Sequence, residues 1–180
     1  MSCSARILSA STGDALVSVA RITGLLGAQS ALAQVLLLAR IPWLERAVGF
    51  DRLTVWHRWN GFACLSLVVL HTAFSLAGYA ALDRLPVLTE ISTMIWGDVY
   101  PGMVTATIGT ALFVGVAASS IAIARRKLSY ELWYAVHLMA YAAIALAWFH
   151  QIPTGNELVI DRIAAGYWRS LYVVCALVLV

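Results

Sequence analysis

The chain has 180 residues, of which 62% are hydrophobic and only 12% are charged, and its formal net charge is +3. Soluble domains contain about 45–50% apolar and about 25% charged residues, so this composition indicates a membrane protein and excludes an ordinary soluble domain. The basic residues lie beside hydrophobic runs and form no patch of their own, which argues against a nucleic-acid partner. The three cysteines are far apart in the sequence, so neither a disulfide framework nor a C-x-x-C redox motif is predicted.

The hydrophobic runs are long enough to predict several membrane-spanning helices. Residues 1–21 are expected to form a polar N-terminal segment without a signal-peptide cleavage site. Crossing about 30 Å of hydrocarbon takes about 20 apolar residues in a helix. Four runs meet this length, at about residues 22–40, 55–80, 102–124 and 131–151, and Ser129 is the predicted N-cap of the last. A fifth run, 167–180, covers only about 22 Å and is expected to be truncated. The predicted fold is an all-α, polytopic membrane helical bundle of four complete transmembrane helices plus a truncated fifth.

The loops between these runs differ in charge, which predicts the orientation in the membrane. The first and third loops, with their flanks, carry the basic residues Arg40, Arg46, Arg52, Arg58 and Arg125–Lys127. The opposite loops, 81–100 and 152–165, hold two arginines and five acidic residues. The positive-inside rule then places the first and third loops in the cytoplasm and the N-terminus outside, in a multi-pass protein of the cell membrane.

All four histidines lie in two of the predicted helices. His57 and His71 are fourteen residues apart, and His137 and His150 are thirteen apart. These separations correspond to about 21 Å and 19.5 Å along a helix axis. Both helices run outward from the cytoplasm, so His57 is expected level with His137 on the cytoplasmic side, and His71 level with His150 on the outer side. Thirteen residues leave a regular helix about 140° short of a common face, so a local bulge, a loosening before Pro153 or a turned position is expected to re-aim His150.

Two facing imidazoles at each level suit two ligands that are stacked across the membrane. A b-type haem takes two axial imidazoles, and its apolar macrocycle fits between helices. Small residues flank the histidines, namely Gly61 and Ala135 at the inner level, and Ala73 and Ala147 at the outer level. A single four-histidine metal centre is excluded because the levels are about 20 Å apart. The alternative is a non-redox helical membrane protein whose histidines make interhelical polar contacts of about 0.6–2 kcal/mol each.

Four short segments carry a resemblance to a known family. They are WHRWNGF with His57, the LH that ends at His71, RRKLSYELWYAVH that ends at His137, and WFHQ with His150. Over about residues 20–180 the chain resembles the transmembrane domain shared by ferric reductases and NADPH oxidases, especially bacterial fusions that precede a flavin-binding module. The resemblance implies an inner b-type haem on His57 and His137 and an outer one on His71 and His150. It also implies that electrons pass from a cytoplasmic flavin through both haems to an external acceptor such as ferric iron or oxygen.

The chain departs from this pattern because it contains no reductase module and no G-x-G-x-x-G phosphate loop. It is therefore predicted to be the membrane part of an oxidoreductase that is not competent alone with NAD(P)H. FAD and NAD(P)H would belong to a C-terminal or separate flavin reductase module. The alternative is a haem-only subunit that delivers electrons to a separate periplasmic reductase. Asp83, Arg84, Glu90 and Asp98 are expected in a solvated outer loop, where they could attract a ferric complex.

Overall fold

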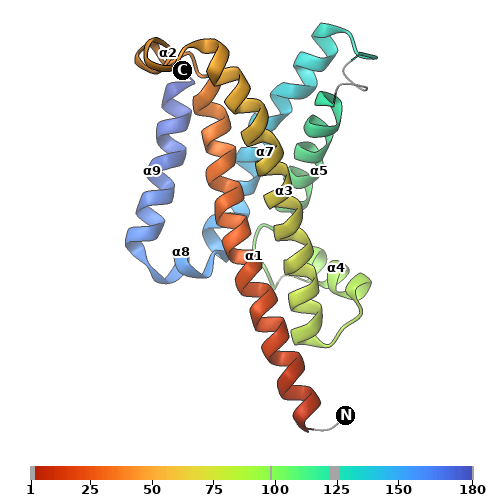
Figure 1. The fold of residues 1–180 in the computed structure, drawn as a ribbon. Coiled ribbons are helices and arrows are strands. Elements are labelled where there is room, and N and C mark those ends of the chain that lie inside the picture. The colour runs from red at the N-terminus through yellow and green to blue at the C-terminus, as the bar shows by residue number, and fades with distance from the viewer. Residues whose placement is uncertain (1–2, 98, 122–125, 180) are drawn as a thin grey trace.

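A computed structural model describes residues 3–97, 99–121 and 126–179 (Figure 1). All regular structure in these ranges is helical, which confirms the predicted all-α class. The helices are α1 (Cys3–Leu38), α2 (Pro42–Val48), α3 (Phe50–Asp83), α4 (Val87–Trp96), α5 (Met103–Ser120), α7 (Tyr130–Thr154), α8 (Asn156–Ile160) and α9 (Arg162–Val178). Residues 122–124 of the predicted third span, and Arg125 of the basic cluster, lie outside the described residues.

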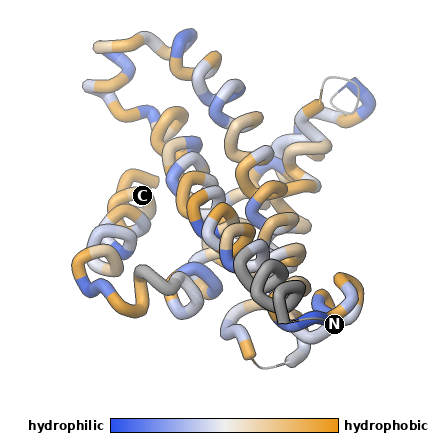
Figure 2. Tube along the Cα trace, turned by 60° about the horizontal axis from the view of Figure 1, so that its bottom comes forward, coloured by the Kyte–Doolittle hydropathy of each residue, from blue (hydrophilic) through white to orange (hydrophobic). Residues whose placement is uncertain are grey.

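Four helices are long and apolar enough to cross a membrane, as the sequence predicted. They cover Thr12–Leu38, Phe50–Asp83, Met103–Ser120 and Tyr130–Thr154. Figure 2 shows that hydrophobic residues recur along the length of these helices. Large apolar side chains such as Phe62, Val69 and Phe149 are exposed, which suits a protein surrounded by lipid. The arrangement is that of a multi-pass membrane protein.

The first helix begins much earlier than the sequence predicted. Residues 3–21, which were expected to be a polar segment, belong to α1. The reason is close packing between α1 and α3: a Cβ at Gly78 would lie 3.0 Å from the Val17 nitrogen and 3.2 Å from the Gly13 oxygen. Val17 and Ala20 are buried on the same face. Small residues at such a crossing allow two backbones to approach, and this contact extends the helix beyond its apolar core.

The loop between the second and third spans contains a helix that the sequence reading missed. α4 follows Pro86, which supplies a rigid N-terminal turn. Its two faces differ strongly, since Glu90 and Met94 are buried one turn apart while Leu88 and Trp96 are 81% and 75% exposed. The signal for this helix was the apolar run VLTEISTMIW itself. The shorter helices α2 and α8 were also not predicted as separate elements.

The long helices form two pairs, α1 with α3 and α5 with α7 (Figure 1). Among the described residues, the two pairs touch each other over short stretches, as where α3 meets α5 and α1 meets α7. α9 packs against α1, and a buried cluster forms where α8 and α9 meet the first pair; it comprises Leu32, Val35, Leu158, Trp168 and Cys175. The Ser129 side chain accepts a hydrogen bond from the Leu132 N–H at 3.2 Å, which confirms the predicted N-cap of α7.

Candidate functional site

The four histidines form two pairs across the space between the helix pairs. His57 on α3 faces His137 on α7, with 6.1 Å between their ring centroids and 51° between their planes. One level away, His71 and His150 face each other with 6.5 Å between centroids and 55° between planes. The structure thus brings together the two pairs that the spacing predicted. The first lies toward the end of the bundle that holds α2, and the second toward the end that holds α4 (Figure 1).

The separation of each pair leaves room for one metal ion between the two rings. A metal–imidazole bond of about 2.0–2.1 Å, with about 1.1 Å from that nitrogen to the ring centre, places two opposite ring centres about 6.3 Å apart. The observed 6.1 Å and 6.5 Å lie on either side of this value. Each pair therefore has the spacing of two axial ligands on one ion.

Hydrogen bonds at Nδ1 orient the first pair. His57 Nδ1 lies 3.3 Å from the Gln34 carbonyl oxygen on α1. His137 Nδ1 lies 3.3 Å from Ser120 Oγ on α5. The Ser120 hydroxyl already donates to the Val116 carbonyl, so it accepts from His137. Both contacts favour the tautomer that carries its proton on Nδ1 and leaves the Nε2 lone pair for a metal.

The second pair has the same arrangement. His71 Nδ1 lies 2.7 Å from the Ala20 carbonyl oxygen. His150 Nδ1 lies 3.2 Å from Thr154 Oγ1, and that hydroxyl donates its own proton to the His150 carbonyl. The Pro101 backbone also lies beside the His150 ring. All four histidines therefore have a partner at Nδ1, and three of the four partners belong to α1 or α5 rather than to the histidines' own helices.

α7 reaches both levels without a break. The sequence predicted a bulge or a loosened turn before Pro153, but α7 is continuous from Tyr130 to Thr154 and includes Pro153. A continuous helix favours the third possibility considered, in which His150 reaches His71 from a turned position. Thr154, one turn further on, contacts His150 Nδ1.

The small residues that lie against the histidine rings differ from those that the sequence predicted. A Cβ at Gly24 on α1 would lie 2.6 Å from His71 Nδ1, so this glycine accommodates the His71 ring. Gly61 does not face the space between the pairs; its added Cβ would meet the Gln34 amide nitrogen at 2.8 Å. Ala73 lines an apolar pocket of about 300 Å³ between α3 and α5, together with Val69, Thr72, Leu76 and Thr110.

An amide network beside His57 was not found by sequence reasoning. Asn60 Nδ2 donates to the Ser30 carbonyl at 2.8 Å and to Gln34 Oε1 at 3.0 Å. These bonds hold α1 against α3 at the turn whose Gln34 carbonyl accepts from His57. On the other side of this pair, the Trp133 ring lies over His137 with 4.9 Å between centroids. The signal for the network was the pair of amide side chains within otherwise apolar spans.

The donor set narrows the kind of ion that each pair can hold. Among the residues that the structure describes, no three side chains of His, Cys, Asp or Glu converge in a way that could hold a metal. A structural zinc ion needs four protein ligands, and each level supplies two imidazoles. An ion held by two histidines takes any further ligands from outside the protein, and a macrocycle can supply four of them. Haem iron fits this donor set, because the porphyrin supplies the equatorial nitrogens.

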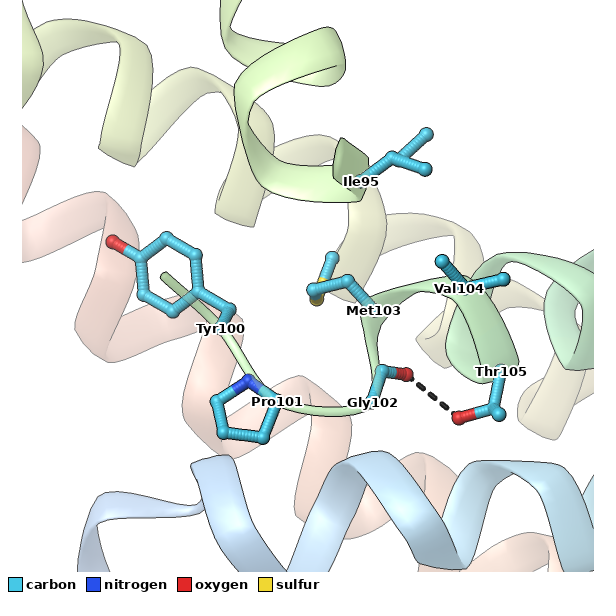
Figure 3. Close-up of a pocket in the computed structure, with 7 residues that line it drawn as sticks. All are labelled: Ile95, Tyr100, Pro101, Gly102, Met103, Val104 and Thr105. Atoms are coloured by element: carbon cyan, nitrogen blue, oxygen red, sulfur yellow. Dashed lines mark hydrogen bonds between the residues drawn. The ribbon is translucent and has the colours of Figure 1, made fainter. Parts of the chain in front are cut away.

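The end of the bundle near His150 carries a pocket and a buried acid. The pocket has a volume of about 280 Å³ and is lined by Ile95, Tyr100, Pro101, Gly102, Met103, Val104 and Thr105 (Figure 3). Asp83 and Arg84 are exposed, as expected of a solvated loop, and Asp98 lies outside the described residues. Glu90, however, is completely buried, which corrects its predicted place in that loop. It cannot attract a ferric complex from solution.

Comparison with known proteins agrees with this geometry. No curated protein and no solved structure matches the chain. A family model described as the ferric reductase like transmembrane component matches residues 23–148, which is well over half of the chain. The match includes His57, His71 and His137 and ends two residues before His150. The chain therefore belongs to the ferric reductase like transmembrane component family.

Proposed function

We propose that the chain carries electrons across the membrane through two stacked b-type haems, one held by His57 and His137 and the other by His71 and His150. Its family is one of transmembrane electron transfer, and its members generally bind haem. The observation that carries the proposal is the pair of ring separations, 6.1 Å and 6.5 Å, between histidines of α3 and α7. Haem, when bound, supplies iron that gains and loses one electron.

The protein's own residues would hold and tune these centres. The Nδ1 bonds to Gln34, Ala20, Ser120 and Thr154 fix the ring orientations. Bonds of this kind also raise the basicity of the ligating nitrogen. The apolar side chains of the spans exclude water from the path, which lowers the local dielectric constant around each centre.

The spacing of the two pairs argues against histidines that merely join helices. With ring centroids 6.1 Å apart and ring nitrogens about 1.1 Å from each centroid, the nearest approach of two nitrogens is about 3.9 Å. That distance exceeds a hydrogen bond, so the facing imidazoles do not bond to each other. The Nδ1 contacts of His57, His71 and His137 do join helices, but they do not account for rings of α3 that face rings of α7 at both levels.

The direction of transfer follows from the distribution of charge. Basic residues flank the loop that contains α2 and the loop before α7, and the positive-inside rule places these loops in the cytoplasm. Electrons would then enter at the His57–His137 level from a flavin reductase module, C-terminal or separate, that oxidises NAD(P)H. They would leave at the His71–His150 level to an external acceptor such as ferric iron or oxygen. The C-terminal end of α9 points toward the same end of the bundle as α2 (Figure 1), where such a module would dock.

Difference spectroscopy tests the proposal directly. The purified protein is expected to show b-type bands in a dithionite-reduced minus oxidised spectrum, with two haems for each chain. A protein that inserts into membranes and folds, but shows no such bands after supplementation with haem, would instead support the non-redox alternative.

A further inference from the structure

The most unusual polar group in the structure is the side chain of Glu90. Its exposure is 0%, although α4 is a short helix near one end of the bundle. Neither of its carboxylate oxygens has a hydrogen-bond partner. Buried carboxylates are normally paired with a cation or bonded to several N–H groups, so this group is neutralised most simply by a proton.

The groups around Glu90 reinforce this conclusion. α4 packs against α3 and α5. From α3 the nearby titratable groups are Asp83 and Tyr79, and from the segment before α5 it is Tyr100; α5 itself contains no ionisable side chain. Burial raises the pKa of Glu90, and the negative charge of Asp83 raises it further. Burial and neighbouring Tyr79 likewise raise the pKa of Tyr100 to about 12, so Tyr100 stays neutral.

A short segment connects this group to the second histidine pair. Tyr100 packs on Tyr79, with 5.0 Å between ring centroids. The backbone of the next residue, Pro101, lies beside the His150 ring. A Cβ at Gly102 would lie 2.9 Å from the His150 Cα, so the segment is in direct contact with α7. Figure 3 shows this segment, with Thr105 donating to the Gly102 carbonyl.

We propose that Glu90 is a proton-binding site coupled to electron transfer at the His71–His150 level. The inference rests on the proposed function. At pH values where Glu90 is ionised before reduction, the arrival of one electron at this level makes the Glu90 carboxylate take up one proton from the outer solution and form one O–H bond. When the electron leaves, that bond breaks and the proton returns. The charge of the buried region is the same before and after, which is favourable where the dielectric constant is low.

The test is the pH dependence of the two midpoint potentials in the haem-loaded protein. One-electron, one-proton coupling changes the reduction equilibrium tenfold for each pH unit, which is about 59 mV. One centre, the one lost in His150→Ala, is expected to approach this slope over part of the range, while the other stays nearly flat. Glu90→Gln is expected to remove the pH dependence of the midpoint potential of the first centre. Glu131→Gln, the same substitution at an exposed site in the first turn of α7, is expected to leave the slope unchanged.

A second variant tests the same idea without changing Glu90. Asp83→Asn removes the negative charge that disfavours ionised Glu90, so the sloping region is expected to move to lower pH. Infrared difference spectra give a readout that is independent of potentials. A carboxyl C=O band is expected to appear on reduction of the wild type and to be absent from Glu90→Gln.

The outcomes distinguish this inference from the proposed function. Absence of b-type bands would overturn the proposed function. Two b-type centres whose potentials do not change with pH, or a slope that persists in Glu90→Gln, would overturn this inference alone. If Glu90→Gln does not fold, an unshifted slope in Asp83→Asn together with no carboxyl band in the wild type would also overturn it.

Discussion

Gly24 on α1 lies directly against the ring of His71 on α3. A Cβ at this glycine would be 2.6 Å from His71 Nδ1 and 2.9 Å from Cε1. The same nitrogen donates to the Ala20 carbonyl, one turn earlier on α1. α1 carries no histidine, yet it positions the His71 ring by giving it both space and a hydrogen-bond acceptor.

Gly24→Ala is therefore expected to displace His71 and to reduce haem binding at that level. Because the clash involves ring atoms rather than the flexible end of a side chain, the ring must move or α1 and α3 must separate. We expect the variant to keep about one haem for each chain, with the remaining centre at the wild-type potential. Haem-to-protein ratios and redox titration measure both quantities.

Gly27→Ala provides a matched control on the same helix. Its added Cβ would meet Val68 Cγ2 at 3.4 Å, an ordinary van der Waals contact. Both substitutions replace a helical glycine with alanine and have a similar effect on helix propensity. If Gly24→Ala retained two centres with wild-type potentials, α1 would not position His71.

His137→Ala tests the pairing of the ligands. Removing one imidazole leaves His57 without its partner, so the haem at that level is expected to be lost while the His71–His150 centre remains. His71→Ala is expected to lose the haem at the His71–His150 level and to keep the His57–His137 centre. The two single variants should therefore retain centres with different potentials. Retention of all haem in His137→Ala, or loss of all haem in a folded protein, would contradict the pairing.

The levels of the four histidines could be predicted because the rise of a helix is constant. Spacings of fourteen and thirteen residues place two imidazoles about 20 Å apart on each helix, whatever the side chains between them. The four apolar spans followed from length and composition in the same way, and the structure confirms them. The level of a histidine along its helix and the position of an apolar span each depend on the sequence of one segment alone.

Features that depend on contacts between segments could not be predicted. The contact of Gly24 with His71 could not be predicted, because nothing in the sequence of α1 indicates that its neighbour is His71. Gly61 was expected to face a ligand, and only the crossing of α1 and α3 shows that it faces Gln34. Glu90 was assigned to a solvated loop because its burial depends on the packing of α4 against α3 and α5.

Asn60→Ala tests the amide network beside His57. The substitution removes two interhelical hydrogen bonds, to the Ser30 carbonyl and to Gln34 Oε1, which together are expected to contribute about 1–2 kcal/mol. The free energy of unfolding in detergent should fall by that amount, and the potential of the His57–His137 centre should shift. Ser30→Ala is the control, because Asn60 bonds to the Ser30 backbone oxygen and that acceptor is kept. Equal effects of the two substitutions would show that the network does not act through Asn60.

The stability of the protein is expected to fall as the pH rises through the pKa of Glu90. The ordinary pKa of this carboxyl is 4.5, and burial in the folded state raises it. Between the unfolded and folded pKa values the folded protein binds more protons at Glu90 than the unfolded chain, so the contribution of Glu90 to stability is greatest below pH 4.5 and decreases above it. The loss is about 1.4 kcal/mol for each unit by which the folded pKa exceeds the unfolded one. Thermal unfolding of wild type and Glu90→Gln over this pH range measures the difference. The variant has no such group, so a wild type that loses no more stability than Glu90→Gln would show that the Glu90 pKa is not raised.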